Sequence, residues 1–271
     1  MVNHELANEY KELCLATGEL FSNRSYPKNT TDWEVVEKVH YGDNFKAVLY
    51  RKGDKYAICF AGTDKKDIRD HIANLSMGLT GDSTQIRNAK KFSEEMMQKY
   101  GLNIENTVVI GHSEGGTEAT IVGITLGFMT VTFNAYGVWS SKYKDTNNLV
   151  INYRDPNDPV SKIHKNVGLT LIVPGKEKAK TRFGCIKAHS ISNFGDCTEA
   201  IPVENYKKMD KNFLDHISET DISRQDIAMM ESSTFAFFEK EIDKRMMNNQ
   251  IKQNNEGNWV TINGNHVLIN K

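Results

Sequence analysis

The sequence Gly111-His-Ser-Glu-Gly115 follows the apolar run Thr107-Val-Val-Ile110 and leads into a stretch with helical character. An apolar strand, a sharp turn with a serine and a following helix form the layout of a nucleophile elbow. Such a turn is strained and lifts the Ser113 hydroxyl above the edge of a sheet. Glycine suits both ends of the motif because a side chain there would collide with the returning helix. The stretch therefore predicts an α/β fold in which Ser113 is a nucleophile.

The segments on both sides of this turn predict a sheet that starts antiparallel and continues parallel. The apolar pattern indicates a helix over 5–22, and then strands over 33–41, 45–51 and 56–61 that are separated by turn-forming residues. It further indicates an amphipathic helix over 83–100 and strands over 107–111, 131–139, 149–153 and 169–173. Helix and strand alternate from residue 83 to 175, which favours parallel pairing. We therefore expect an α/β-hydrolase fold, in which helices flank a central, mostly parallel sheet with an antiparallel N-terminal meander.

The length of 271 residues suits one large α/β domain or two small ones. We expect a hydrolase domain over 1–248, and we expect the C-terminal third of the chain to be helical up to about residue 248. Residues 249–258 are polar and are typical of a linker. Residues 259–271 predict a short C-terminal β hairpin that turns at Asn263-Gly264.

Composition excludes several classes of protein. The 34 basic and 35 acidic residues nearly balance, so no strong field favours binding to nucleic acid or to an anionic membrane. The sequence contains no transmembrane run and no signal peptide, which predicts a cytoplasmic location, with export by another route or association with a virion as alternatives. The four cysteines lack C-x-x-C spacing, so we expect reduced thiols, and a Cys185–Cys197 bridge is the less favoured alternative. The chemistry outlined below requires no metal or cofactor.

A serine nucleophile needs a histidine base, and the base needs a carboxylate that fixes its tautomer. In α/β-hydrolases the chain order is Ser, then Asp or Glu, then His. Asp158 follows the strand over 149–153 in an Asp-Pro turn that we expect to be exposed, and it is the preferred acid, with Asp155 as its competitor.

His189 is the preferred base because it follows the strand over 169–173 and a loop. His216 is the main alternative, and His164 stands too close in sequence to Asp158. His112 is expected to point away from the nucleophile that follows it.

The oxyanion of the tetrahedral intermediate requires two donors. One is the backbone N–H of the residue after the nucleophile, Glu114. The other is expected from Thr63, through its N–H and hydroxyl, because Phe60-Ala-Gly-Thr63 directly follows a strand.

Five motifs together resemble class 3 (fungal-type) lipases and their bacterial or phage-encoded relatives. In order, they are Phe60-Ala-Gly-Thr63, Gly111-His-Ser-Glu-Gly-Gly116, Thr132-Phe-Asn-Ala-Tyr-Gly137, Asn157-Asp-Pro-Val160 and His189-Ser-Ile-Ser-Asn-Phe194. The resemblance implies an α/β-hydrolase fold, hydrolysis of carboxylic esters, and a triad of Ser113, Asp158 and His189. It also implies that Thr63 donates to the oxyanion and that a lid or its remnant follows Thr63.

Two features depart from that family. Where this chain has Glu114, the family often has leucine, and we expect the glutamate side chain to point outward, where the helix N-terminus favours a negative charge. The expected lid begins with the strongly charged stretch Lys65-Lys-Asp-Ile-Arg-Asp-His71. This charge favours a soluble or amphiphilic ester as substrate over emulsified triglyceride.

The leading hypothesis is therefore a serine esterase, lipase or phospholipase that works through an acyl-enzyme on an ester or lipid-like substrate. A thioesterase or amidase with the same triad is an alternative, and so is a catalytically silent binding or virion-associated protein on the same scaffold. The tail over 259–271 vaguely resembles the ends of phage minor head proteins. It is either a docking tag for a partner or a hairpin packed on the domain.

Overall fold

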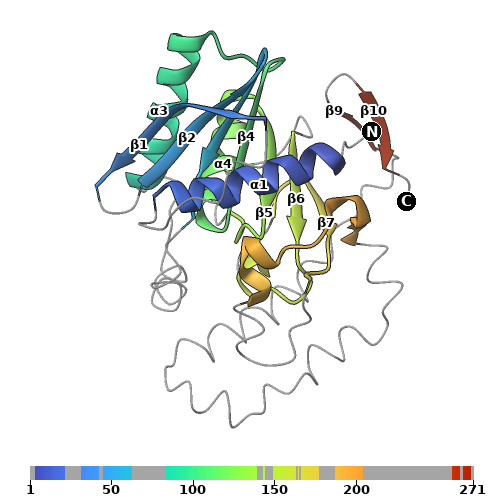
Figure 1. Cartoon of the computed structure of the whole chain (residues 1–271). Helices are drawn as coiled ribbons and strands as arrows, with labels where there is room; N and C mark the ends of the chain where they lie inside the picture. The colour runs from blue at the N-terminus through green and yellow to red at the C-terminus, as the bar shows by residue number, and fades with distance from the viewer. Residues whose placement is uncertain are drawn as a thin grey trace, which may run out of the picture.

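An eight-stranded sheet lies at the centre of the fold, as the computed structural model in Figure 1 shows. The structure describes residues 4–21, 32–42, 45–62, 84–138, 143, 149–162, 164, 166–176, 187–203, 258–262 and 265–269. The helices are α1 (His4–Leu20), α3 (Thr84–Tyr100) and α4 (Glu114–Leu126), with short 3-10 turns η1 (Val160–Lys162), η2 (Ile191–Asn193) and η3 (Cys197–Glu199). The strands of the sheet are β1 (Glu34–Tyr41), β2 (Phe45–Lys52), β3 (Lys55–Phe60), β4 (Thr107–His112), β5 (Met129–Phe133), β6 (Val150–Arg154), β7 (Leu169–Ile172) and β8 (Ile201–Pro202).

The strands follow one another across the sheet in sequence order. The pairs β1–β2 and β2–β3 are antiparallel, the pairs from β3 to β7 are parallel, and β8 is antiparallel at the far edge. The predicted α/β-hydrolase fold, with its antiparallel meander and mostly parallel sheet, is confirmed. The strand predicted over 131–139 is too long, because β5 ends at Phe133 and Asn134 takes a left-handed backbone with φ of 47°.

Helices cover both faces of the sheet, and side chains alternate between the two faces along each strand. One core joins α1 to residues such as Val48, Tyr50 and Cys59, and α1 crosses the front of the sheet in Figure 1. The second core joins α3 and α4 to residues such as Leu49 and Ile58. The central strands are therefore apolar on both faces, as is usual for parallel sheets covered on both sides.

Helix α3 shows the predicted amphipathic face, with Ile86, Ala89, Phe92 and Met96 buried at helical spacing. Helix α4 is different because every residue from 114 to 123 is buried. Its small residues permit this central position, since a Cβ at Gly123 would overlap the Thr130 hydroxyl on β5. The helix then ends at Gly127, whose φ of 79° gives a left-handed C-cap.

Cys14, Cys59 and Cys197 are free thiols, as expected, and Cys185 lies outside the described residues. In the tail, β9 (Asn258–Ile262) pairs antiparallel with β10 (Asn265–Ile269). The expected lid, most of the C-terminal third that was expected to be helical, most of the linker and the Asn263-Gly264 turn lie outside the described residues. The domain boundary at 248 therefore stays a prediction. None of the helices described is long and apolar enough to cross a membrane.

Candidate active site

Ser113 occupies the sharp turn between β4 and α4. Its φ of 58° and ψ of −123° lie in a region that residues other than glycine rarely adopt. A Cβ at Gly111 would overlap the backbone of Gly115 in the returning helix, as predicted from the sequence. A Cβ at Gly115 would instead overlap the carbonyl of Phe60 on β3, so this glycine is required by the neighbouring strand.

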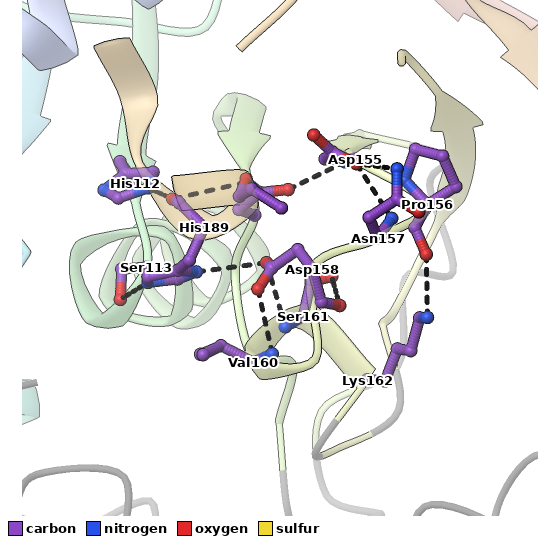
Figure 2. A network of polar contacts seen from close by, with 12 residues as sticks. His112, Ser113, Asp155, Pro156, Asn157, Asp158, Val160, Ser161, Lys162 and His189 are labelled. Atoms are coloured by element: carbon purple, nitrogen blue, oxygen red, sulfur yellow. Dashed lines mark hydrogen bonds and ion pairs between the residues drawn. The ribbon is translucent and has the colours of Figure 1, made fainter. Parts of the chain in front are cut away.

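Ser113, His189 and Asp158 form a continuous hydrogen-bonded chain, which Figure 2 shows from close by. The distance from His189 Nε2 to Ser113 Oγ is 2.8 Å, and the distance from His189 Nδ1 to Asp158 Oδ2 is 3.0 Å. The three side chains come from the β4–α4 turn, the loop after β6 and a short helical turn over 187–189. All three residues are buried, with relative exposures of 8%, 1% and 0% for Ser113, His189 and Asp158.

The Asp158 carboxylate is fixed by its own loop. The backbone N–H of Val160 donates to Oδ1 at 2.9 Å, and that of Ser161 donates to Oδ2 at 3.1 Å. Burial alone would raise the pKa of Asp158, but the charge and hydrogen bond of His189, together with the loop donors, outweigh it and lower the pKa. An ionised Asp158 accepts from Nδ1–H of His189, which leaves Nε2 free to accept the proton of Ser113.

Asp155, the competing acid, has no hydrogen bond to His189 among those described. Its Oδ1 accepts from the backbone and side chain of Asn157, at 2.8 and 3.3 Å, and its carbonyl accepts from the N–H of Asp158. Burial raises its pKa to about 6, against the opposing effect of the bond from the Asn157 backbone. The structure therefore brings Asp158, and not Asp155, to the histidine, while Asp155 shapes the turn that presents it.

Of the other histidines weighed for the site, His164 and His112 are described. His164 is buried with its ring edge against Tyr136, and its N–H donates to the Tyr136 carbonyl. His112 lies beside His189, as Figure 2 shows, with Nε2 2.7 Å from the His189 carbonyl oxygen. The alternative base His216 lies outside the described residues.

The expected outward orientation of the Glu114 side chain is wrong, because the residue is buried, with a relative exposure of 5%. The reason is the burial of α4 on all sides, which leaves no solvent face at its first turn. Burial, followed by the negative charge of Glu114, raises the pKa values of both Glu118 and Tyr136. The positive end of the helix dipole stabilises a carboxylate in this position.

Of the two expected oxyanion donors, only Glu114 lies in the described part of the chain. Glu114 is the first residue of α4, where backbone N–H groups point out of the helix N-terminus beside Ser113. Thr63 lies outside the described residues. The preceding residue is described, and a Cβ at Gly62 would lie 3.2 Å from the Cβ of Ser113, so the end of the described loop after β3 passes directly beside Ser113.

Sequence reasoning missed the part that Asn134 plays at this site. Its Nδ2 donates to the Ala188 carbonyl at 2.9 Å, and its Oδ1 accepts from the N–H of Asp155 at 2.8 Å. The one signal present was the residue type, because asparagine tolerates positive φ, although Asn134 stands inside the strand predicted over 131–139. No group of three or more His, Cys, Asp or Glu residues that could hold a metal occurs in the described part of the chain.

Residues 19–165, more than half of the chain, match the family described as phospholipase-like, Tle-like phospholipase domain. The chain belongs to this Tle-like phospholipase family. The match includes Ser113 and Asp158 and ends before His189. It confirms the lipase-like α/β-hydrolase expected from the motifs and identifies the chain as a member of a phospholipase- or lipase-like hydrolase family.

Two further proteins are similar to this Tle-like phospholipase domain. Extracellular phospholipase A1 of Serratia liquefaciens is 33% identical over 97 residues, which are 36% of this chain and 29% of the relative's length. The crystal structure of Lip2 lipase from Yarrowia lipolytica superimposes with a TM-score of 0.47 at 13% identity, over 73% of this chain and 83% of that one.

Proposed function

We propose that this chain is a serine hydrolase that cleaves the acyl esters of phospholipids through an acyl-enzyme. The observation that carries the proposal is the hydrogen-bonded chain from Ser113 through His189 to Asp158, with distances of 2.8 and 3.0 Å. The phospholipase family supports a lipid ester as substrate. The similarity to a protein named extracellular phospholipase A1 supports phospholipid among lipid esters.

In the acylation step, His189 Nε2 takes the proton of Ser113 as Oγ attacks the ester carbonyl. The positive charge that forms on the imidazole is stabilised by the ionised Asp158, which keeps Nδ1–H as a donor. The N–H of Glu114 at the N-terminus of α4 and a donor from Thr63 hold the oxyanion. His189 then returns its proton to the alkoxide leaving group, and the acyl chain stays on Ser113.

In the deacylation step, water gives a proton to His189 Nε2 and attacks the acyl-enzyme carbonyl. Collapse of the second tetrahedral intermediate breaks the bond to Ser113 Oγ, which recovers its proton from His189 and releases the fatty acid. Both steps use the burial of the three side chains, since charge interactions are stronger where water is excluded.

The test is release of fatty acid from phosphatidylcholine in mixed micelles. We expect turnover by the wild type, and a loss of turnover by at least about 10³-fold in Ser113→Ala. Ser190→Ala is the matched control, because Ser190 adjoins His189 but its hydroxyl bonds only Ser192 among the described contacts. A Ser113→Ala protein that keeps its activity, or a folded wild type that turns over no phospholipid, would overturn the proposal.

A further inference from the structure

Two consecutive residues at the end of β5 contact all three segments that carry the triad. The carbonyl of Phe133 accepts from the backbone N–H of Ser113 at 3.1 Å. The side chain of the next residue, Asn134, lies between the loop of Asp158 and the segment of His189. The strand end itself is held in the sheet, since the Asn134 N–H donates to the Tyr153 carbonyl at 2.9 Å.

Asn134 uses both ends of its amide in opposite senses. Nδ2 donates to the carbonyls of Ala188 at 2.9 Å and His189 at 3.4 Å, and Oδ1 accepts from the N–H of Asp155 at 2.8 Å. Carbonyls only accept and a backbone N–H only donates, so the amide has a single orientation that satisfies its partners. Asn134 is fully buried, and its φ of 47° is a strained backbone conformation. These hydrogen bonds offset the free-energy cost of that conformation.

His112 makes a second contact with the backbone of His189. Because the carbonyl of His189 can only accept, His112 donates from Nε2 over 2.7 Å. The two imidazole rings also lie against each other, with centroids 4.9 Å apart and planes tilted by 36°. Figure 2 shows His112 beside His189, next to Ser113. The carbonyl oxygen of His189 therefore receives donors from both β4 and the end of β5.

We propose that Asn134 and His112 are positioning residues that hold the backbone of His189, and so keep its Nε2 within hydrogen-bond distance of Ser113. This inference rests on the function proposed above. Asp158 fixes the far side of the imidazole ring, but a ring is placed only as well as the backbone that carries it. Neither residue is needed to hold substrate in this account, so their loss slows the chemical step and leaves substrate binding unchanged.

The primary variant is Asn134→Gly, because glycine adopts positive φ without strain and only the side-chain contacts are lost. A misplacement of about 1 Å at a reacting group can cost about 100-fold in rate. On a soluble nitrophenyl ester we expect kcat to fall by about 10- to 100-fold and KM to stay within about 2-fold. The rate of labelling by a fluorophosphonate should fall by the same factor as kcat.

Asn152→Ala is the matched control. Asn152 is also a buried asparagine, and it bridges β6 to its neighbours by accepting from Thr132 and donating to Val167. It does not contact the described segments of the triad. We expect Asn152→Ala to lower the Tm about as much as Asn134→Gly and to leave kcat within about 2-fold.

His112→Phe is an independent second variant, which keeps an aromatic ring against His189 and removes the donor. We expect kcat to fall by about 5- to 20-fold with KM retained. Unchanged kcat in a folded Asn134→Gly protein would overturn the inference, as would an equal fall of kcat in the Asn152→Ala control. If Asn134→Gly does not fold, His112→Phe decides, and unchanged kcat there overturns it. Failure of the proposed function is a different result, since the wild type would then show no turnover that depends on Ser113.

Discussion

Asp155 and Asp158 lie in the same loop after β6, so the same substitution of aspartate by asparagine at each position gives two variants that can be compared directly. In Asp158→Asn, one of the two oxygens becomes an NH2 group that cannot accept. If NH2 replaces Oδ2, it faces His189 and the Ser161 N–H, and the histidine must accept at Nδ1. The imidazole proton then lies on Nε2, which can no longer take the proton of Ser113. If NH2 replaces Oδ1, it faces the N–H of Val160 and that hydrogen bond is lost.

Both orientations therefore cost a hydrogen bond, and one of them also holds the wrong tautomer of the base. Conversion of a triad acid to its amide typically lowers kcat about 10⁴-fold. This factor corresponds to about 5.5 kcal/mol of transition-state stabilisation. We expect a loss of this order in Asp158→Asn, with KM little changed, because the carboxylate lies behind the histidine and is fully buried.

Asp155→Asn should behave in the opposite way. The buried Asp155 carboxyl has a pKa of about 6, against an ordinary value of 3.8. The folded protein binds this proton more tightly than the unfolded chain does. The stability that the protonated Asp155 contributes is therefore fully present below about pH 4 and is lost as pH rises through 6. This difference amounts to about 3 kcal/mol above pH 7, which an asparagine removes. We expect Asp155→Asn to keep kcat within about 3-fold and to be the more stable protein at pH 8.

The assay is the kcat for hydrolysis of a nitrophenyl ester by both variants, with urea unfolding at pH 4.5 and pH 8. A large loss of kcat in Asp155→Asn with normal activity in Asp158→Asn would refute the assignment of the acid. An Asp155→Asn protein whose stability follows that of the wild type at both pH values would refute the reasoning on burial.

Further predictions concern the elbow and the helix that follows it. Gly115→Ala should destabilise the fold by more than about 2 kcal/mol, because the added Cβ would overlap the Phe60 carbonyl. Gly18→Ala in α1, where nothing lies within 4 Å of the added Cβ, should stabilise the fold by about 0.5–1 kcal/mol. Urea unfolding measures both changes, and equal effects of the two substitutions would contradict the packing argument. Burial, followed by the charge of Glu114, holds the pKa of Glu118 well above its ordinary value, so this group's contribution is complete below about pH 4.5 and falls as pH rises. Between pH 5 and 8 the free energy of unfolding should therefore fall less in Glu118→Gln than in the wild type, by about 1.4 kcal/mol for each pH unit within the titration window. Free energies of unfolding that change in parallel with pH in the two proteins would contradict this.

The sequence predicted the sheet and the elbow because both depend on local patterns. The run over 107–110, the two glycines and the alternation of apolar segments each carry their own signal. The strand order was not predicted, and the structure shows that each strand pairs with its sequence neighbours. The C-terminal end of β5 was placed too late because Ala135, Tyr136, Val138 and Trp139 are apolar enough to continue a strand. The positive φ that ends the strand has no local marker other than the asparagine at 134.

The side chains of the site were harder to predict because their orientation depends on tertiary contacts. Asp155 and Asp158 each precede a proline in the same turn. The hydrogen bond between His189 Nδ1 and Asp158 Oδ2 shows which carboxylate faces the histidine, and the backbone N–H groups of Val160 and Ser161 hold it there. Glu114 was expected at the surface from its charge. Its burial follows from the central position of α4, which packs against the sheet and against α3. The local sequence of a helix does not show which other elements will pack around it.

The proposed function requires that Ser113 is the nucleophile and that His189 activates it. The most direct measurement is peptide-level mass spectrometry after reaction with a fluorophosphonate. We expect one adduct per chain on the peptide that contains Ser113, none in Ser113→Ala, and labelling at least about 10³-fold slower in His189→Ala. An adduct on another residue, or equal labelling of the wild type and Ser113→Ala, would contradict it.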